Sequence, residues 1–289
     1  MLPYHTPVLL RESVSALSIK PSGVYVDATF GGGGHSRAIL ECLSPKGRLI
    51  AMDQDSDALA NAPDDKRLTV AHANFRFIHN FVRYNGYDGV DGILADLGVS
   101  SHQFDTEERG FSFRFDSELD MRMNSKGGKT AADIVNSYTR EGLERIFNIY
   151  GELNNSRHIA ELICTARSAS PIRTTSELNA AIAKTIPQFA EHKYLAKVYQ
   201  ALRIEVNDEM AALERFVPMA IKSLNPGGVL AVITYHSLED RIVKNAIRDA
   251  IAEKRMAKVT SKPILPSEDE IHSNTRARSA KLRVARRTE

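Results

Sequence analysis

The chain has 289 residues, of which 43% are hydrophobic and 26% charged, and its formal net charge is +2 at pH 7. This composition is typical of a globular protein and argues against a disordered, collagenous or fibrous one. No apolar run approaches the ~20 residues that span a bilayer, and residues 1–6 lack the pattern of a secretory signal. We therefore expect a cytoplasmic protein without membrane contact, in which Cys42 and Cys164 are buried, reduced thiols.

Short apolar segments alternate with helix-length spacers through the first hundred residues. Residues 23–27, 47–53, 68–72 and 90–96 are typical of strands, and residues 36–41 are typical of a helix. Strands of continuous apolar character are buried on both faces, which indicates a parallel sheet covered by helices. The sequence therefore predicts an α/β, doubly wound (Rossmann-like) fold.

This alternation stops after residue 96 and resumes with a fifth strand at 228–235, which follows the turn at 225–228. Between them, Thr130 and Thr174 each begin a capping-box pattern followed by an apolar periodicity of helical type. An unstructured loop of about a hundred residues is improbable in a compact protein. We predict an all-helical domain at 104–203, inserted into a main domain made of 1–103 and 204–289.

A run of four glycines, 31–34, follows the first strand and begins the first helix. Glycine lets the backbone approach a ligand closely, and a helix N-terminus favours anions, so the run predicts a nucleotide-like cofactor. Two residues favour S-adenosylmethionine over a dinucleotide. Ser36 stands where a dinucleotide fold prefers a smaller residue, and Asp27 would repel a pyrophosphate but suits a cationic amino acid. Asp27 could also be an ordinary strand-end residue.

Asp53 ends the second strand, 22 residues after Gly31. A carboxylate about 20 residues after a glycine loop can accept hydrogen bonds from both ribose hydroxyls, in S-adenosylmethionine as in NAD. Asp55 and Asp57 are expected to be solvated acids at a helix start. Phe75, after the third strand, can cover an adenine ring or belong to the core.

Asp96 ends the fourth strand, and His236 follows the fifth. In a parallel sheet both positions fall at the carboxyl edge, where cofactor and substrate meet. Asp96 is the first candidate for a catalytic acceptor, followed by Ser100 and His236. His236 fits a helix-start polar group equally well.

The segment 274–289 carries six basic residues and one acid. Its charges suit contacts with phosphate groups. Because Ala280, Leu282 and Val284 alternate with Lys281 and Arg283, we expect a half-buried edge strand with a charged outer face, which could also contact nucleic acid.

Across almost its whole length the sequence resembles the bacterial 16S ribosomal RNA cytosine-N4-methyltransferases. The resemblance is carried by ordered blocks at residues 5–10, 27–36, 96–101, 109–113, 119–123, 200–204, 206–209, 236–241 and 276–280. The chain departs from the family at His102 and Phe104, where relatives often have proline and leucine. It also departs at 117–118, where Ser-Glu replaces the usual Gly-Pro.

The resemblance implies methylation of the exocyclic N4 of a cytidine in the decoding region of 16S rRNA, within the small ribosomal subunit. It implies S-adenosylmethionine as cofactor and no metal, and it makes the inserted domain a substrate-recognition domain. Whether the protein forms a homodimer is left open. The cofactor contacts that carry over are Gly33, Gly34, His35, Asp53, Phe75, Asp96 and Gln103.

Two other functions compete with this interpretation. A nicotinamide-dependent oxidoreductase can share the sheet, and a ribosome-assembly factor without activity can keep the fold to bind RNA. Methylation at cytosine C5 requires a cysteine nucleophile, whereas Cys42 and Cys164 lie in helix-like segments away from the sheet edge. The acid, Asn or Ser followed by Pro-Pro-aromatic of DNA amino-methyltransferases is absent, because Asp96 is followed by Leu97-Gly98-Val99.

Overall fold

A computed structural model describes residues 7–288. Residues 1–6, which include His5 and Thr6 of the first family block, and Glu289 lie outside the described residues. The chain divides into two compact units, one made of residues 1–98 and 210–289 and the other of residues 99–209. Among the helices formed by residues 7–288, none combines the length and the apolar character needed to cross a membrane.

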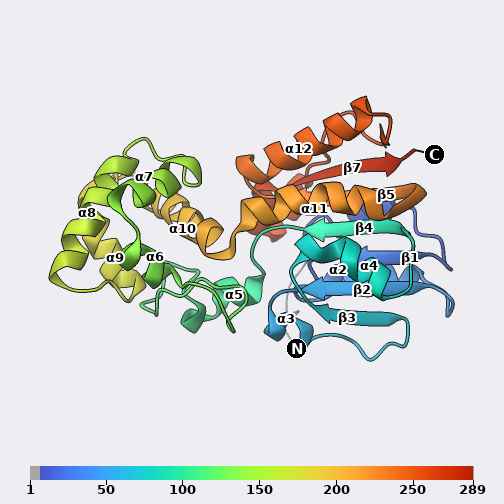
Figure 1. The fold of residues 1–289 in the computed structure, drawn as a ribbon, viewed down its shortest axis with the longest axis horizontal. Helices are drawn as coiled ribbons and strands as arrows, with labels where there is room; N and C mark the ends of the chain where they lie inside the picture. Colours follow the sequence, from blue (N-terminus) through green and yellow to red (C-terminus); the bar gives the residue numbers. More distant parts are fainter. Residues whose placement is uncertain (1–6, 289) are drawn as a thin grey trace. The chain divides into compact units, whose positions relative to one another are not determined.

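The first unit is built around a seven-stranded sheet in the order β3-β2-β1-β4-β5-β7-β6 (Figure 1). Its strands are β1 (Val24–Asp27), β2 (Arg48–Asp53), β3 (Leu68–His72), β4 (Val90–Asp96), β5 (Leu224–Thr234), β6 (Met256–Lys258) and β7 (Lys281–Arg287). Its helices are α1 (Leu10–Leu17), α2 (Gly34–Cys42), α3 (Ser56–Leu59), η1 (Phe75–Phe77), α4 (Ile78–Tyr84), α11 (Glu209–Ser223), α12 (Ser237–Ala252), α13 (Glu268–Ser273) and η4 (Thr275–Ser279).

The α/β fold and the five predicted strands are confirmed, with two corrections. The sheet is parallel from β3 to β5, but β7 pairs antiparallel with both β5 and β6. β7 is therefore not the edge strand that its alternating residues predicted. The edge is β6, whose three residues are too few to show a period. The fifth strand also begins earlier than predicted, at Leu224, and its register with β4 shifts around the predicted turn.

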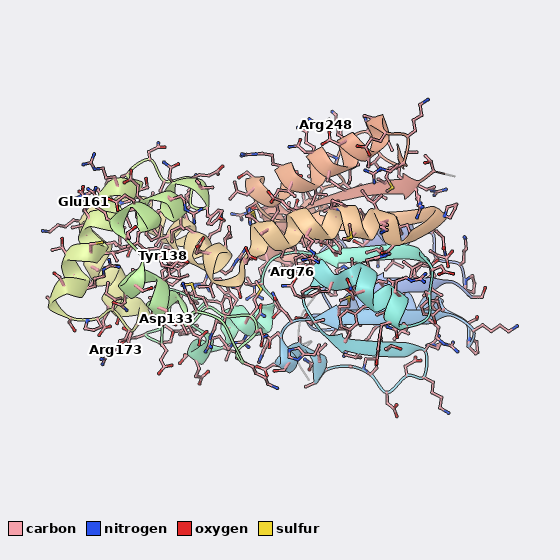
Figure 2. The ribbon with its side chains drawn as sticks, in the orientation of Figure 1. Arg76, Asp133, Tyr138, Glu161, Arg173 and Arg248 are labelled. Atoms are coloured by element: carbon pink, nitrogen blue, oxygen red, sulfur yellow. The ribbon has the colours of Figure 1, made fainter. Side chains whose placement is uncertain are left out.

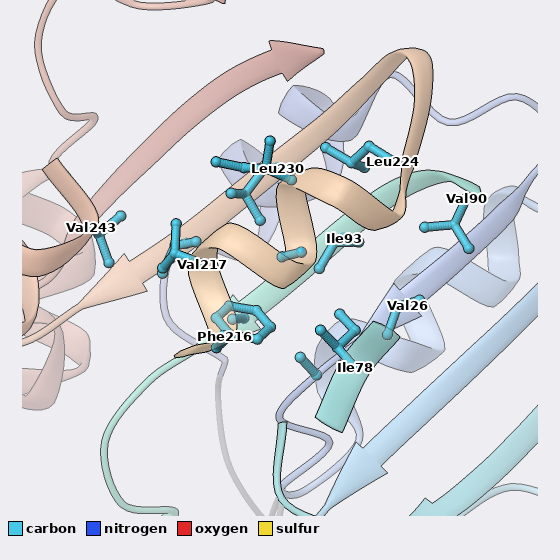
Figure 3. Close-up of a cluster of buried hydrophobic side chains, with 14 of the residues drawn as sticks. Val26, Ile78, Val90, Ile93, Phe216, Val217, Leu224, Leu230 and Val243 are labelled. Atoms are coloured by element: carbon cyan, nitrogen blue, oxygen red, sulfur yellow. The ribbon is translucent and has the colours of Figure 1, made fainter. Parts of the chain in front are cut away.

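Each face of the sheet is buried under a different set of helices. On one face Val26, Ile93 and Leu230 pack with residues of α4, α11 and α12, including Ile78 and Phe216 (Figure 3). On the other face the alternate strand residues, such as Tyr25, Leu94 and Ala231, pack with α1, α2 and η4. Since side chains alternate across a strand, the continuous apolar runs supply both faces.

The second unit consists of helices with irregular connections (Figure 1). They are α5 (Ser101–Asp105), η2 (Glu107–Arg109), α6 (Ala131–Ser137), α7 (Arg140–Ile149), α8 (Ser156–Ala169), α9 (Thr175–Ile182), η3 (Ala183–Thr185) and α10 (Glu191–Asn207). Both predicted capping boxes form. Thr130 and Asp133 begin α6, and Thr174 and Glu177 begin α9 (Asp133 is labelled in Figure 2).

A separate apolar core holds the second unit together. Phe147, Ile159, Ile163 and Leu202 are all fully buried within it. α10 runs through residue 203, where the sequence placed the end of the inserted domain, and the compact unit extends from Val99 to Glu209.

The expectation of two buried thiols is wrong for Cys42 and only partly met by Cys164. Cys42 is the last residue of α2 and is exposed, and Cys164 in α8 is partly buried; both are free. The last turn of a surface helix has few neighbours to cover it, which apolar composition alone does not reveal.

Candidate functional site

Three carboxylates lie at the carboxyl ends of neighbouring parallel strands. Asp27 ends β1, Asp53 ends β2 and Asp96 ends β4, and β1 lies between the other two strands. The loops that follow β1, β2 and β4 therefore each begin at one of these acids. The parallel register therefore gathers residues that are far apart in the sequence, as expected for a site at this edge.

The loop after β1 is shaped by its glycines. Gly31 and Gly33 have φ angles of 51° and 74°, a region that favours glycine, and Gly33 forms the N-cap of α2. A Cβ on Gly33 would lie 2.7 Å from Phe30 Cζ. A Cβ on Gly34 would lie 2.1 Å from Pro7 Cγ, so glycine at this position is required by packing within the chain.

Asp27 is almost completely buried, at 1% exposure. Its Oδ2 accepts a 2.6 Å hydrogen bond from the hydroxyl of Ser36, and its Oδ1 accepts one from the backbone N–H of Thr29. Burial raises the pKa of Asp27 to about 7, the two hydrogen bonds lower it, and the charge of Asp53 raises it. Ser36 is thus the buried partner of Asp27, which explains why a serine occupies this position.

Asp53 connects the glycine loop to the loop after β2. Its Oδ2 accepts from the N–H of Gly31 at 2.8 Å, and its Oδ1 accepts from the N–H of Asp55 at 2.9 Å. Burial raises the pKa of Asp53 to about 6, against the lowering by these hydrogen bonds, and the nearby charge of Asp55 raises it as well. The side chain is partly exposed, so lone pairs on both oxygens remain for a ligand.

The two acids after Asp53 differ from each other. Asp57 is exposed, as expected. Asp55 was expected to be solvated but is only 1% exposed, because its side chain caps α3 by accepting from the N–H of Asp57. Phe75 lies in η1 and packs edge-on against Phe216, with the ring centroids 5.1 Å apart. It is only partly buried, so its packing in the core leaves part of the ring exposed.

Asp96 forms two hydrogen bonds and lies near a histidine. Its backbone N–H donates to the hydroxyl of Thr29, and its Oδ1 accepts a 2.7 Å hydrogen bond from the hydroxyl of Tyr235. Its Oδ2 lies 3.8 Å from Nδ1 of His35, whose Nε2 is 3.1 Å from the carbonyl oxygen of Val8. The side chain is 20% exposed, so it can be reached from outside.

Burial raises the pKa of Asp96 to about 7. The hydrogen bond from Tyr235 lowers the pKa, whereas the charges of Asp27 and Glu239 raise it. A carboxyl group with a pKa near neutrality is poised to accept a proton at physiological pH.

His236 lies at the start of α12, as one of its two interpretations expected. It is the N-cap residue, with Nδ1 accepting from the N–H of Glu239, and its Nε2 lies 3.1 Å from Oε1 of Glu239. With Nδ1 used by the helix, the ring is engaged in capping. Ser100 and Gln103 belong to the second unit, where they form the capping box of α5.

Tyr235, Thr29 and Glu239 are site residues that the sequence analysis did not single out. Tyr235 stands between the fifth strand and His236, at the predicted edge, and this position was the available signal. For Thr29, the available signal was its place within the family block at residues 27–36. Glu239 lies within the family block at 236–241 and completes a capping box three residues after His236, but its contact with the N–H of Tyr235, at 2.8 Å, depends on the local path of the chain.

Three basic residues of the C-terminal segment are engaged within the first unit. Arg283 donates to both carboxylate oxygens of Asp240 in α12, and Lys281 lies 3.5 Å from the same group. Arg287 donates to the backbone carbonyl oxygens of Lys222 and Leu224. The strand face that was expected to contact nucleic acid is thus covered by a helix, and Arg286 remains the exposed arginine of β7.

The acids define what the site can hold. In the described part of the chain, no arginine or lysine pairs with Asp27, Asp53 or Asp96, so a pyrophosphate would be repelled and a cationic nucleoside attracted. The carboxylate of Asp53 suits a ribose diol, and the glycine loop brings backbone close to that carboxylate. The residues therefore fit S-adenosylmethionine, which carries a ribose and two cationic groups.

The model of the MraW methylase family matches residues 3–288. A protein of Bacteroides fragilis strain YCH46, named ribosomal RNA small subunit methyltransferase H, is 54% identical over 294 residues, covering 98% of this chain and 97% of that protein. A protein of the same name from Flavobacterium johnsoniae is 52% identical, with the same coverage.

Among solved structures, a putative methyltransferase from Streptococcus mutans in complex with SAH matches with a TM-score of 0.45 and 12% identity, covering 98% of this chain and 99% of that one. The sheet, the acids at its edge and the family match define a Rossmann-like methyltransferase whose cofactor is S-adenosylmethionine. Within that class, the chain belongs to the MraW methylase family.

Proposed function

We propose that the chain transfers a methyl group from S-adenosylmethionine to the exocyclic N4 of a cytidine in the decoding region of 16S rRNA, within the small ribosomal subunit. The names of the relatives support a small-subunit rRNA substrate, and the family resemblance of the sequence supports N4 and the decoding region. The observation that carries the enzymatic part is the group of three carboxylates at one sheet edge, which have no arginine or lysine partner among residues 7–288.

In this proposal Asp53 binds the ribose hydroxyls and Phe75 covers the adenine. The loop residues Gly33, Gly34 and His35 line the cofactor, and Asp27 and Asp96 face its cationic groups. Gln103 contacts the cofactor, as the family resemblance implies, and the second unit recognises the substrate.

When bound, S-adenosylmethionine supplies an electrophilic methyl group, whose bond to sulfur breaks with the electron pair left on sulfur. The cytosine amine is a poor nucleophile because its lone pair is conjugated with the ring, so the protein must align it. A hydrogen-bond acceptor on the amine N–H localises the lone pair and stabilises the positive charge that develops on nitrogen. Asp96 fills this role and takes the proton that the amine loses, because its Oδ2 is not occupied by Tyr235.

Ser100 and His236 are weaker candidates for the acceptor. Each is engaged as the cap of a helix, Ser100 by accepting from the N–H of Gln103 and His236 from that of Glu239. A cysteine mechanism at C5 is disfavoured. Cys42 ends the helix that returns from the carboxyl edge, so it lies toward the opposite edge of the sheet, and Cys164 belongs to the second unit.

The test is to incubate the protein with S-adenosylmethionine and small subunits that lack the modification, and to analyse the nucleosides by mass spectrometry. We expect N4-methylcytidine. We also expect Asp53→Ala to bind the cofactor at least 100-fold more weakly in calorimetry, because it removes the ribose acceptor and the partner of two backbone N–H groups. Asp120→Ala, a paired acid of the second unit, is the matched control and should keep wild-type cofactor affinity.

The outcomes separate the alternatives. Well-folded, cofactor-loaded protein that yields no N4-methylcytidine would overturn the proposed reaction. If it bound subunits without modifying them, an assembly factor would be the better interpretation. Binding of NAD in preference to S-adenosylmethionine would contradict the assignment of the acids.

A further inference from the structure

Tyr235 stands immediately after β5 and reaches the end of the neighbouring strand β4. Its hydroxyl is 2.7 Å from Oδ1 of Asp96, although the two residues are 139 positions apart. Among the described residues it is the one hydrogen-bond donor to this carboxylate. Within residues 7–288, this hydrogen bond is therefore the one that orients the carboxylate of the proposed acceptor.

The tyrosine is itself fixed at both ends. Its backbone N–H donates to Oε2 of Glu239, which is 2% exposed. Its ring lies beside Gly98, where a Cβ would be 3.4 Å from Cδ2. Burial raises the pKa of Tyr235 far above its usual value, and the charge of Asp96 raises it further, so the hydroxyl keeps its proton and always donates.

We propose that Tyr235 is a positioning residue for methyl transfer, whose hydroxyl holds Asp96 through Oδ1 and so makes Oδ2 the oxygen that accepts the substrate proton. This inference rests on the proposed role of Asp96. Tyr235 does not touch the reacting atoms in this scheme; it acts through the carboxylate.

Several charged groups face Asp96 from the surrounding elements. Asp27 at the end of β1 and Glu239 in α12 oppose its ionisation. His35 in α2 lies 3.8 Å from Oδ2, beyond hydrogen-bond distance. The Tyr235 hydroxyl is thus the contact that favours the ionised form at hydrogen-bond distance. Without it, the balance moves toward the protonated acid, which cannot accept a proton.

The experiment compares Tyr235→Phe with Tyr25→Phe. Both changes delete one hydroxyl and keep the ring. Tyr25 is buried in the same unit, and its hydroxyl accepts from the N–H of Lys20, near the other end of the strands. The first readout needs no cofactor: the pKa of Asp96 is followed by carbon NMR in protein with labelled aspartate, with Asp96→Asn providing the assignment. We expect Tyr235→Phe to raise this pKa by about one unit and Tyr25→Phe to leave it unchanged.

The second readout is the rate of methyl transfer to small subunits as a function of pH. In Tyr235→Phe the acid limb of kcat should move up by about one pH unit, and the plateau should fall about tenfold with KM for the subunit unchanged. In the Asp96→Asn background, Tyr235→Phe should have no further effect, because the interaction that it removes is already gone.

A wild-type pKa of Asp96 together with a wild-type pH profile in Tyr235→Phe would overturn the inference. So would an equal loss of kcat in the presence and absence of the Asp96 carboxylate, since that would mean that the tyrosine acts only through packing. Failure of the proposed function would look different, because the wild-type protein itself would then form no N4-methylcytidine.

Discussion

Two acids of the second unit and the three acids at the sheet edge of the first unit differ in the groups that compensate their charge. In the second unit, Asp120 accepts two hydrogen bonds from the guanidinium of Arg122, and Glu161 lies within 3.4 Å of Arg140 and Arg157 (Glu161 is labelled in Figure 2). At the sheet edge of the first unit, by contrast, Asp27, Asp53 and Asp96 are held by neutral hydroxyl and N–H groups and repel one another.

This difference distinguishes a binding site from a scaffold. An acid that is paired with a cation of the same chain attracts a cationic ligand only weakly. Three acids whose pKa values are raised to about 6 or 7 represent electrostatic free energy that a cationic ligand can recover. The site is identified by acids whose charge is not compensated by a nearby cation, and not by the number of acids.

The largest effect is expected from Asp27→Asn, because it removes the most deeply buried of the three charges. Asp27 keeps its proton in the folded state up to about pH 7, whereas in the unfolded chain it loses it near pH 4. The folded state binds more protons between these values, so the free energy of unfolding falls as pH rises through them. Asparagine does not titrate, so the variant should not lose stability in this way. The free energy of unfolding of the variant minus that of wild type should therefore be about 2–3 kcal/mol larger at pH 8 than at pH 5, as measured by urea unfolding. Parallel pH curves for the two proteins would show that the charge of Asp27 is compensated after all.

A smaller effect is expected from Thr130→Ala in the second unit. The hydroxyl of Thr130 accepts from the N–H of Asp133 at the start of α6, and loss of such a cap costs about 1 kcal/mol. Hydrogen bonds from Thr130 lower the pKa of Asp133, so its contribution is lost as pH falls, opposite in sign to that of Asp27. Thermal unfolding and calorimetry should find reduced stability with unchanged affinity for S-adenosylmethionine. A changed affinity would contradict the separation of site from scaffold.

The smallest effect is expected from Arg286→Ala, which tests the C-terminal strand. Arg286 is exposed, so its removal should reduce the slope of log affinity for RNA against log salt concentration by about one and leave stability unchanged. Arg283→Ala is the matched control. It should leave the salt slope unchanged and lower stability, because Asp240 loses its bidentate partner. If both variants had the same slope as wild type, β7 would have no part in RNA binding.

The sequence predicted those features that depend on local pattern. Asp53 and Asp96 could be identified because each directly follows an apolar run, and the capping boxes at Thr130 and Thr174 because their residues are three apart. The topology of the parallel strands then brought the acids together, as the fold class predicts.

What could not be predicted depends on partners that are distant in the sequence. The role of Tyr235 follows from a residue 139 positions away, and Ser36 could be interpreted only as a misfit until Asp27 was seen beside it. β7 was placed at the edge because β6 is too short to have a period, and its basic residues were expected to be solvated because Asp240 lies in another element. In each case the residue types were visible in the sequence. What the sequence did not show was which group of another element each side chain contacts.

The order of the strands has a consequence for synthesis of the chain. β4 and β5 are neighbours in the sheet, but Asp96 and its register partner Ile233 are separated by the whole second unit. The four strands β1 to β4 can therefore assemble on the ribosome while β4 still has an unpaired edge, and closing so long a loop is slow unless the intervening residues have already folded. All three acids are present in this half-built sheet, but Tyr235 arrives with β5. The nascent protein thus acquires its negative charges first and the contact that orients Asp96 only after the last third of the chain has begun to fold.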